Sequence, residues 1–135
     1  MKIKITLLLV VLLSLGLLTT GCGSKTSHLE TGGINATDLL NNLLDKTNRI
    51  LSDVVNVQTA EAALPQLEAV NDGYDRLIDE MSDLSPAGRA EISEQAAKAM
   101  PGLKGNARRM NSKEGIEDII GPEMNKMVTK LSKLL

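Results

Sequence analysis

Apolar residues recur every three or four positions from residue 37 to residue 135, the spacing that places them on one face of an α-helix. The first helical segment carries such a stripe over 40–55, and Asn35 or Thr37 can cap its start. The second segment has Thr59 as its expected cap, and Pro65 either begins the helix proper or kinks it. The stripe of this second segment consists of Leu64, Leu67, Val70, Tyr74, Leu77, Ile78, Met81 and Leu84.

Two further helical segments follow. In the third, Ser85 is placed to cap the helix and Pro86 to occupy its first position. Pro101 and Gly102 predict a kink or a break in this segment, because proline removes a helical hydrogen bond. The fourth segment is expected to start near Ser112, to break at Gly121 and Pro122, and to continue to the last residue.

The composition agrees with a helical fold. Tyr74 is the only aromatic residue of the 135-residue chain, whereas Leu, Ala, Met, Lys and Glu, which favour helices, are abundant. No stretch of useful length alternates between apolar and polar residues as a half-buried strand does. Short connections between antiparallel helices build a bundle. The sequence therefore predicts an all-α fold, a small three- to four-helix bundle over 37–135.

The polar positions of these helices are charged, with opposite signs in different segments. The outer face of the second segment is acidic, which favours a solvated surface over a cation site, because a straight helix does not converge the oxygens that Ca²⁺ needs. The third segment is basic. It either touches an anionic membrane or polymer, or faces the acidic second segment inside the bundle. Its cations are Lys98, Lys104, Arg108, Arg109 and Lys113.

Other candidate chemistry in the bundle is sparse. Asn71 and Tyr74 lie on or beside the second stripe, where they mark either a ligand pocket or polar groups of a small core. The amphipathic C-terminal segment, with Lys126, Lys130 and Lys133, is expected as a bundle helix rather than an interfacial one. The net charge of −2 and the lack of aromatic residues for base stacking argue against a nucleic-acid partner.

The N-terminus has the layout of a secretory signal peptide. Lys2 and Lys4 precede an apolar run over 5–18, and small residues follow. The run is shorter than the roughly 20 residues of a membrane-spanning helix. We therefore expect residues 1–21 to be a signal peptide that is removed after export.

The residues at the end of this segment resemble the lipobox of bacterial lipoproteins. They are Leu18, Thr19, Thr20, Gly21 and Cys22. The resemblance implies cleavage before Cys22 and lipidation of Cys22 through a thioether, with palmitate among the acyl groups. Thr19 departs from the family pattern, which usually has Leu at that place. Gly23 follows the cysteine where an Asp would favour the inner membrane, so the family rule implies the outer membrane if the host is Gram-negative.

Residues 22–36 are expected to form the lipidated cysteine and a flexible tether rich in Gly, Ser and Thr. A catalytic role for Cys22 would need a base close by, and the only histidine, His28, lies in this tether, which cannot hold a dyad in place. One Cys and one His make neither an internal disulfide nor a zinc site. We therefore expect no catalytic, cofactor-binding or metal site.

These parts predict a membrane-anchored lipoprotein of the cell envelope that faces outward from the cytoplasm. It is expected to act non-enzymatically, by binding or scaffolding. Its expected partners are the membrane, through the lipid anchor, and an envelope protein. The alternative is a carrier that holds an apolar ligand or lipid between the helices. The stretch 59–77 also resembles helical segments of uncharacterised exported bacterial proteins, a likeness that implies no chemistry.

Overall fold

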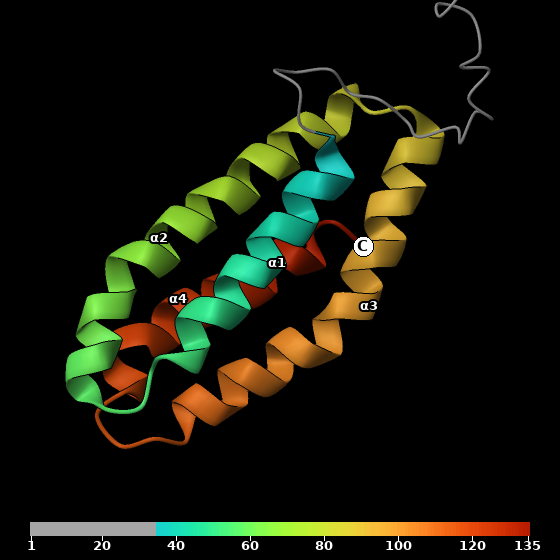
Figure 1. Cartoon of the computed structure of the whole chain (residues 1–135). Helices are drawn as coiled ribbons and strands as arrows, with labels where there is room; N and C mark the ends of the chain where they lie inside the picture. The colour runs from blue at the N-terminus through green and yellow to red at the C-terminus, as the bar shows by residue number, and fades with distance from the viewer. Residues whose placement is uncertain (1–34) are drawn as a thin grey trace, which may run out of the picture.

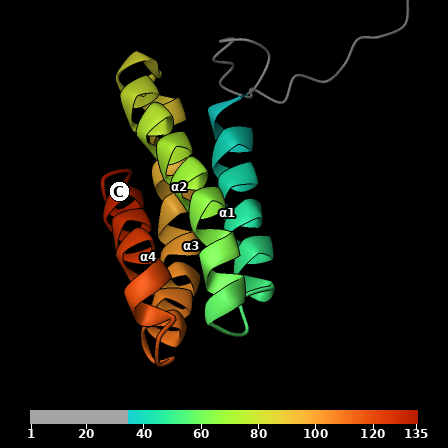
Figure 2. The ribbon, with the colours of Figure 1, turned by 90° about the vertical axis from the view of Figure 1, so that its left-hand side faces the viewer.

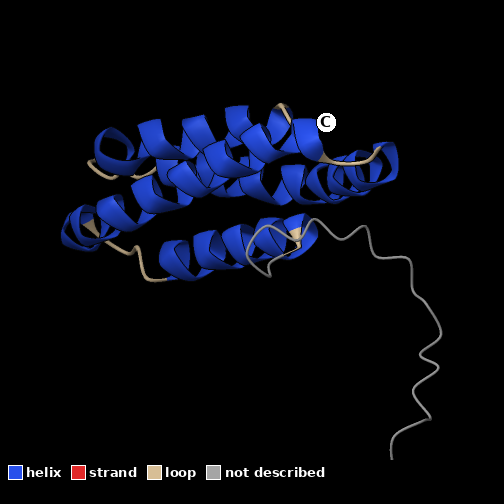
Figure 3. Cartoon of the chain, turned by 90° about the horizontal axis from the view of Figure 1, so that it is seen from above, coloured by secondary structure: helices blue, strands red, loops and turns tan. Residues whose placement is uncertain are grey.

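The computed structural model describes residues 35–135, and this part of the chain is helical throughout, with short loops and no strand (Figures 1 and 3). The predicted all-α bundle is therefore confirmed, with four helices. The signal peptide, Cys22 and most of the predicted tether lie outside the described residues. The elements are α1 (Ala36–Ser52), α2 (Val57–Glu80), the short 3₁₀ helix η1 (Met81–Asp83), α3 (Pro86–Asn111) and α4 (Glu117–Ser132).

The four helices form two antiparallel hairpins, α1–α2 and α3–α4. The hairpins pack against each other so that their first helices, α1 and α3, run in the same direction (Figure 1). As a result α2 packs on α4, the most extensive contact of the bundle, and α1 packs on α3. The connection through η1 crosses one end of the bundle, so α2 and α3 lie on opposite sides of it (Figure 2). Helices that follow each other along the chain are therefore not all neighbours in space.

Polar side chains cap three of the helices. Asn35 accepts a hydrogen bond from the Thr37 backbone N–H at the start of α1, and Ser85 accepts one from Gly88 at the start of α3, as predicted. The predicted cap of α2 was wrong. Asn56 caps this helix, and Thr59 is its third residue, which bonds back to the Asn56 N–H in a reciprocal capping box.

The three prolines inside helices do not break them, contrary to the predicted interruptions. α2 begins eight residues before Pro65, and α3 and α4 run unbroken through Pro101 and Pro122. All three prolines are exposed, so the carbonyl that each one deprives of its hydrogen bond can bind water instead. Figure 1 shows α3 changing direction partway along its length, which is the bend that the sequence predicted without the break.

The fourth helix begins later than predicted. Ser112 ends α3 instead of starting α4, and the turn that follows contains Gly115 with a φ of 78°. A side chain at this position would be strained by the backbone conformation and would meet Val57 as well. Glu117 and Asp118 then occupy the first turn of α4, where acidic groups are favourable.

The core is one continuous cluster of aliphatic and methionine side chains from all four helices. Leu40, Leu67, Ile92 and Met124 are each almost completely buried. α1 and α2 approach closely at Gly73, where an added Cβ would lie 2.4 Å from Leu43 Cδ2. The predicted stripes therefore face the core, except that Val55, at the end of the first stripe, lies beyond α1 and is 67% exposed.

Candidate functional site

The predicted lipid anchor lies outside the described residues. Cys22 and the tether histidine His28 both precede residue 35, so the structure says nothing of either side chain. Within 35–135, none of the helices combines the length and the apolar character needed to cross a bilayer. The part of the chain that can be analysed for a site is therefore the bundle itself.

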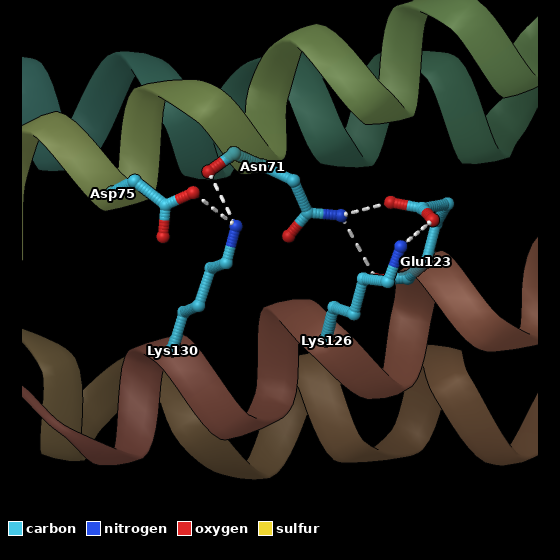
Figure 4. A network of polar contacts seen from close by, with 5 residues as sticks. All are labelled: Asn71, Asp75, Glu123, Lys126 and Lys130. Atoms are coloured by element: carbon cyan, nitrogen blue, oxygen red, sulfur yellow. Dashed lines mark hydrogen bonds and ion pairs between the residues drawn. The ribbon is translucent and has the colours of Figure 1, made fainter.

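The most concentrated polar chemistry in the bundle is a seam between α2 and α4, made of Asn71, Asp75, Glu123, Lys126 and Lys130, that is buried at its centre and exposed at Asp75 and Lys126 (Figure 4). Asn71 and Glu123 are 3% and 7% exposed. The Asn71 amide Nδ2 donates to Glu123 Oε2 at 2.7 Å and to the Glu123 backbone carbonyl at 3.1 Å. Lys126 donates to the other oxygen of the Glu123 carboxylate. The buried charge therefore has both an amide donor and a cation.

A second set of contacts joins the same two helices one turn further along. Lys130 Nζ donates to Asp75 Oδ2 at 2.7 Å and to the backbone carbonyl of Asn71 at 2.9 Å (Figure 4).

The hydrogen bond and charge of Glu123 raise the pKa of Lys126, so Lys126 stays protonated. These directional contacts fix how far α4 can slide or rotate along α2.

Two buried polar atoms near the seam have no hydrogen-bond partner among the described residues, Oδ1 of Asn71 and the hydroxyl of Tyr74. Burial raises the pKa of Tyr74 to about 12, and the nearby Thr47 hydroxyl offsets part of this shift. Thr47 gives its own proton to the Leu43 carbonyl at 2.8 Å. Of the two sequence interpretations, polar groups of a small core describe Asn71 and Tyr74 better, since both are almost completely buried among core side chains.

The contacts of the seam join α2 to α4. The Glu123 carboxylate is buried and already paired with Asn71 and Lys126. Among residues 35–135, no group of three or more His, Cys, Asp or Glu side chains is arranged to hold a metal ion. The predicted acidic face of α2 is exposed, and its Arg76 forms no ion pair within the described part of the chain.

The basic stretch of α3 does not face the acidic helix. α2 and α3 lie diagonally across the bundle, so the predicted pairing between them is wrong. Lys98 pairs with Glu94 of its own helix at 2.6 Å, and Lys113 reaches the Val54 carbonyl at 3.4 Å. The other three cations, Lys104, Arg108 and Arg109, are exposed and form no ion pair with the described residues.

Two hollows lie on the surface of α3. One is a groove of about 230 Å³ between α1 and α3, with Leu44, Thr47 and Asn48 on one wall and Lys98, Ala99, Gly102 and Leu103 on the other. The other is a more open hollow of about 440 Å³. It is lined by Ala97, Met100, Pro101, Lys104, Arg108 and Leu135. Both hollows combine an apolar floor with cations at the edge, which suits amphipathic ligands better than purely polar ones.

The chain has no recognisable relative in three comparisons: no protein-family model, no curated protein and no solved structure matches it. Its function must therefore be argued from its own residues.

Sequence reasoning missed Glu123 as a buried residue. The residue lies between Ile120 and Met127 at core spacing, which is a signal that a carboxylate there needs a partner. The partner, Asn71, lies 52 positions earlier in the chain. Without knowing that α2 packs on α4, the two could not be connected.

Proposed function

We propose that this protein is a lipid-anchored lipoprotein of the bacterial cell envelope whose helical bundle acts by binding or scaffolding, without catalysis. The observation that carries the proposal is the order of residues at the N-terminus: two lysines, an apolar run, small residues and then the single cysteine, Cys22. Each buried CH₂ of an acyl chain contributes about 0.8 kcal/mol, and two or more chains hold a protein firmly. Such an anchor needs no help from the bundle. Gly23 favours the outer membrane in a Gram-negative host.

The charges of the bundle support a binding role. The acidic outer face of α2 and the unpaired cations of α3 lie on opposite sides, so two partners of different charge can be engaged at once. Most polar groups of the seam already bond one another between α2 and α4, Oδ1 of Asn71 being the exception. Surface contact with an envelope protein or with the membrane therefore uses the groups that the fold leaves available.

The anchor is tested on the full-length protein expressed in a bacterial host. Intact mass and N-terminal peptide analysis should find a mature chain that begins at an acylated Cys22. Cys22→Ala should abolish both cleavage and acylation, whereas the matched variant Ser24→Ala should be processed like the wild type. A mature protein with an unmodified Cys22, or one that begins at another residue, would overturn the proposal. Mass analysis is decisive where fractionation is not, because an uncleaved signal peptide also holds a protein in the membrane.

The groove between α1 and α3 favours a second candidate function, a carrier for a small apolar ligand. Leu44, Ala99 and Leu103 provide apolar walls, and an added Cβ at Gly102 would point into open space. Gly102→Leu should fill the groove and weaken binding of the uncharged fluorescent probe N-phenyl-1-naphthylamine. Gly105→Leu is the matched control, since Gly105 is equally open but does not line the groove. Equal probe binding by the two variants would rule the carrier function out.

A further inference from the structure

The exposed side of α3 carries cations that the fold does not use. Lys104, Arg108 and Arg109 are exposed and unpaired within the described part of the chain, and no acidic residue occurs between Glu94 and Glu114. Because α2 lies diagonally opposite, its acidic side chains do not neutralise them. Exposed cations that are close together and unpaired repel one another, so they favour an anionic partner.

The residues beside these cations on the same face of α3 are small. Ala97 and Pro101 line the hollow beside Lys104 and Arg108, together with the buried Met100 and the exposed Leu135. Gly105 follows, and nothing lies within 4 Å of the Cβ it lacks. Helical spacing puts Ala97, Pro101, Lys104, Gly105 and Arg108 on one face of α3, with Arg109 at its edge. Long cationic side chains around small residues allow a broad anionic surface to approach the helix closely.

We propose that this α3 cationic face, defined as Ala97, Pro101, Lys104, Gly105, Arg108 and Arg109, docks on the anionic phospholipid headgroups of the bilayer that holds the protein. The inference rests on the proposed lipid anchor, which supplies the bilayer. A Gly- and Ser-rich linker of 13 residues, the number from Gly23 to Asn35, would span about 20 Å root-mean-square. α1 and α3 run in the same direction, and Asn106 bonds Asn48 near the end of α1. The face therefore lies toward the end of the bundle away from residue 36, and it reaches the headgroups when the bundle lies along the bilayer.

The apolar floor of the hollow distinguishes a phospholipid from a purely ionic partner. A phosphate can lie between Lys104 and Arg108 while the glycerol and first methylenes contact Met100 and Pro101. Each cation near an anionic bilayer strengthens docking about fivefold. Neutralising Lys104 and Arg108 together should therefore reduce the ratio of docked to undocked protein about 25-fold. Added salt should weaken docking, since the contacts are at the surface.

The test uses the mature lipidated protein, purified from membranes and placed in two kinds of vesicle. One kind contains about 30% phosphatidylglycerol, an anionic lipid, in phosphatidylcholine, and the other contains phosphatidylcholine alone. A dye on Gly105→Cys should be quenched by a lipid with a nitroxide headgroup in the anionic vesicles only. A dye on Ala69→Cys, an exposed position of α2, should stay unquenched in both. A lipidated Cys22 has no free thiol, so the introduced cysteine alone takes the dye.

Matched variants identify the residues responsible. Lys104→Gln with Arg108→Gln should abolish the quenching at position 105. Lys46→Gln with Arg76→Gln removes the same charges from exposed positions on α1 and α2 and should leave the quenching unchanged. Equal quenching in both vesicle types, none in either, or no effect of the Lys104 and Arg108 substitutions would overturn the docking inference.

A failure of the anchor would look different in the same experiment. If Cys22 takes up the dye as well, the proposed lipidation is wrong. Docking is then decided by sedimentation of the same protein with the two kinds of vesicle, which needs no anchor. Binding to anionic vesicles that disappears with the Lys104 and Arg108 substitutions would support the cationic face, and its absence would overturn it.

Discussion

Replacing Tyr74 with Phe is expected to keep the fold and to stabilise it. The ring of Tyr74 is fully buried, and its hydroxyl has no hydrogen-bond partner among the described residues. The substitution removes only that oxygen, so the ring keeps its place in the core and little space is left behind. A buried polar group without a partner costs about 1 to 3 kcal/mol. We therefore expect the free energy of unfolding to rise by about 1 kcal/mol.

The same hydroxyl makes stability depend on pH in the alkaline range. Burial raises the pKa of Tyr74 to about 12 in the folded protein, from 10.0. Because Tyr74 ionises first in the unfolded chain, ionisation favours unfolding. The free energy of unfolding keeps its full value below pH 10 and falls as the pH rises from about 10 to about 12. At pH 11 the loss amounts to about 1.4 kcal/mol. The Phe variant has no hydroxyl and should not show this loss.

Urea unfolding followed by far-ultraviolet circular dichroism, at about pH 8 and at pH 11, measures both effects. The difference between the two proteins isolates Tyr74, since every other titrating group is common to both. The reasoning would be refuted by a Phe variant that is less stable than the wild type at pH 8 and loses as much stability as the wild type at pH 11. That outcome would mean that the hydroxyl is hydrogen-bonded in solution, to the neighbouring Thr47 side chain or to a buried water molecule.

Three further stability predictions follow from the packing of the helices, each measured by urea unfolding. Asn71→Leu should destabilise the fold by about 2 kcal/mol, since it removes the amide donor of the buried Glu123 carboxylate. Adding Glu123→Leu should recover most of that loss, and purely additive losses would contradict the seam. Gly105→Ala should stabilise α3 by about 0.5 to 1 kcal/mol, because its Cβ meets open space. Gly73→Ala should be less stable than Gly105→Ala because it displaces Leu43, and equal stability would mean that Leu43 moves aside without cost.

The helices could be predicted because the signals that define them are local. Ser85 and Pro86 start α3 as predicted, and the apolar stripes face the core. Local signals misled where two of them competed. Thr59 was preferred as a cap although Asn56, three residues earlier, has the better capping side chain. A break at Pro122 was wrong, and at Pro101 only the kink of the predicted kink or break occurs, because at exposed positions water can replace the lost hydrogen bond while the buried side of the helix holds the turn together.

The neighbours of each helix could not be predicted, and neither could the seam. An apolar stripe tells which face of a helix is buried but not which helix covers it. The same-direction stacking of the two hairpins decides that Asn71 meets Glu123. It also decides that the cations of α3 lie away from the acids of α2. Opposite charges in the sequence suggested a pair, and the topology separated them.

The burial of the single tyrosine has a practical consequence for the study of this protein. With no tryptophan or phenylalanine in the chain, its near-ultraviolet spectrum comes from one ring at the centre of the bundle. Loosening of the core should therefore change that signal even while the helices persist. The natural chain thus carries its own optical reporter, with no label attached.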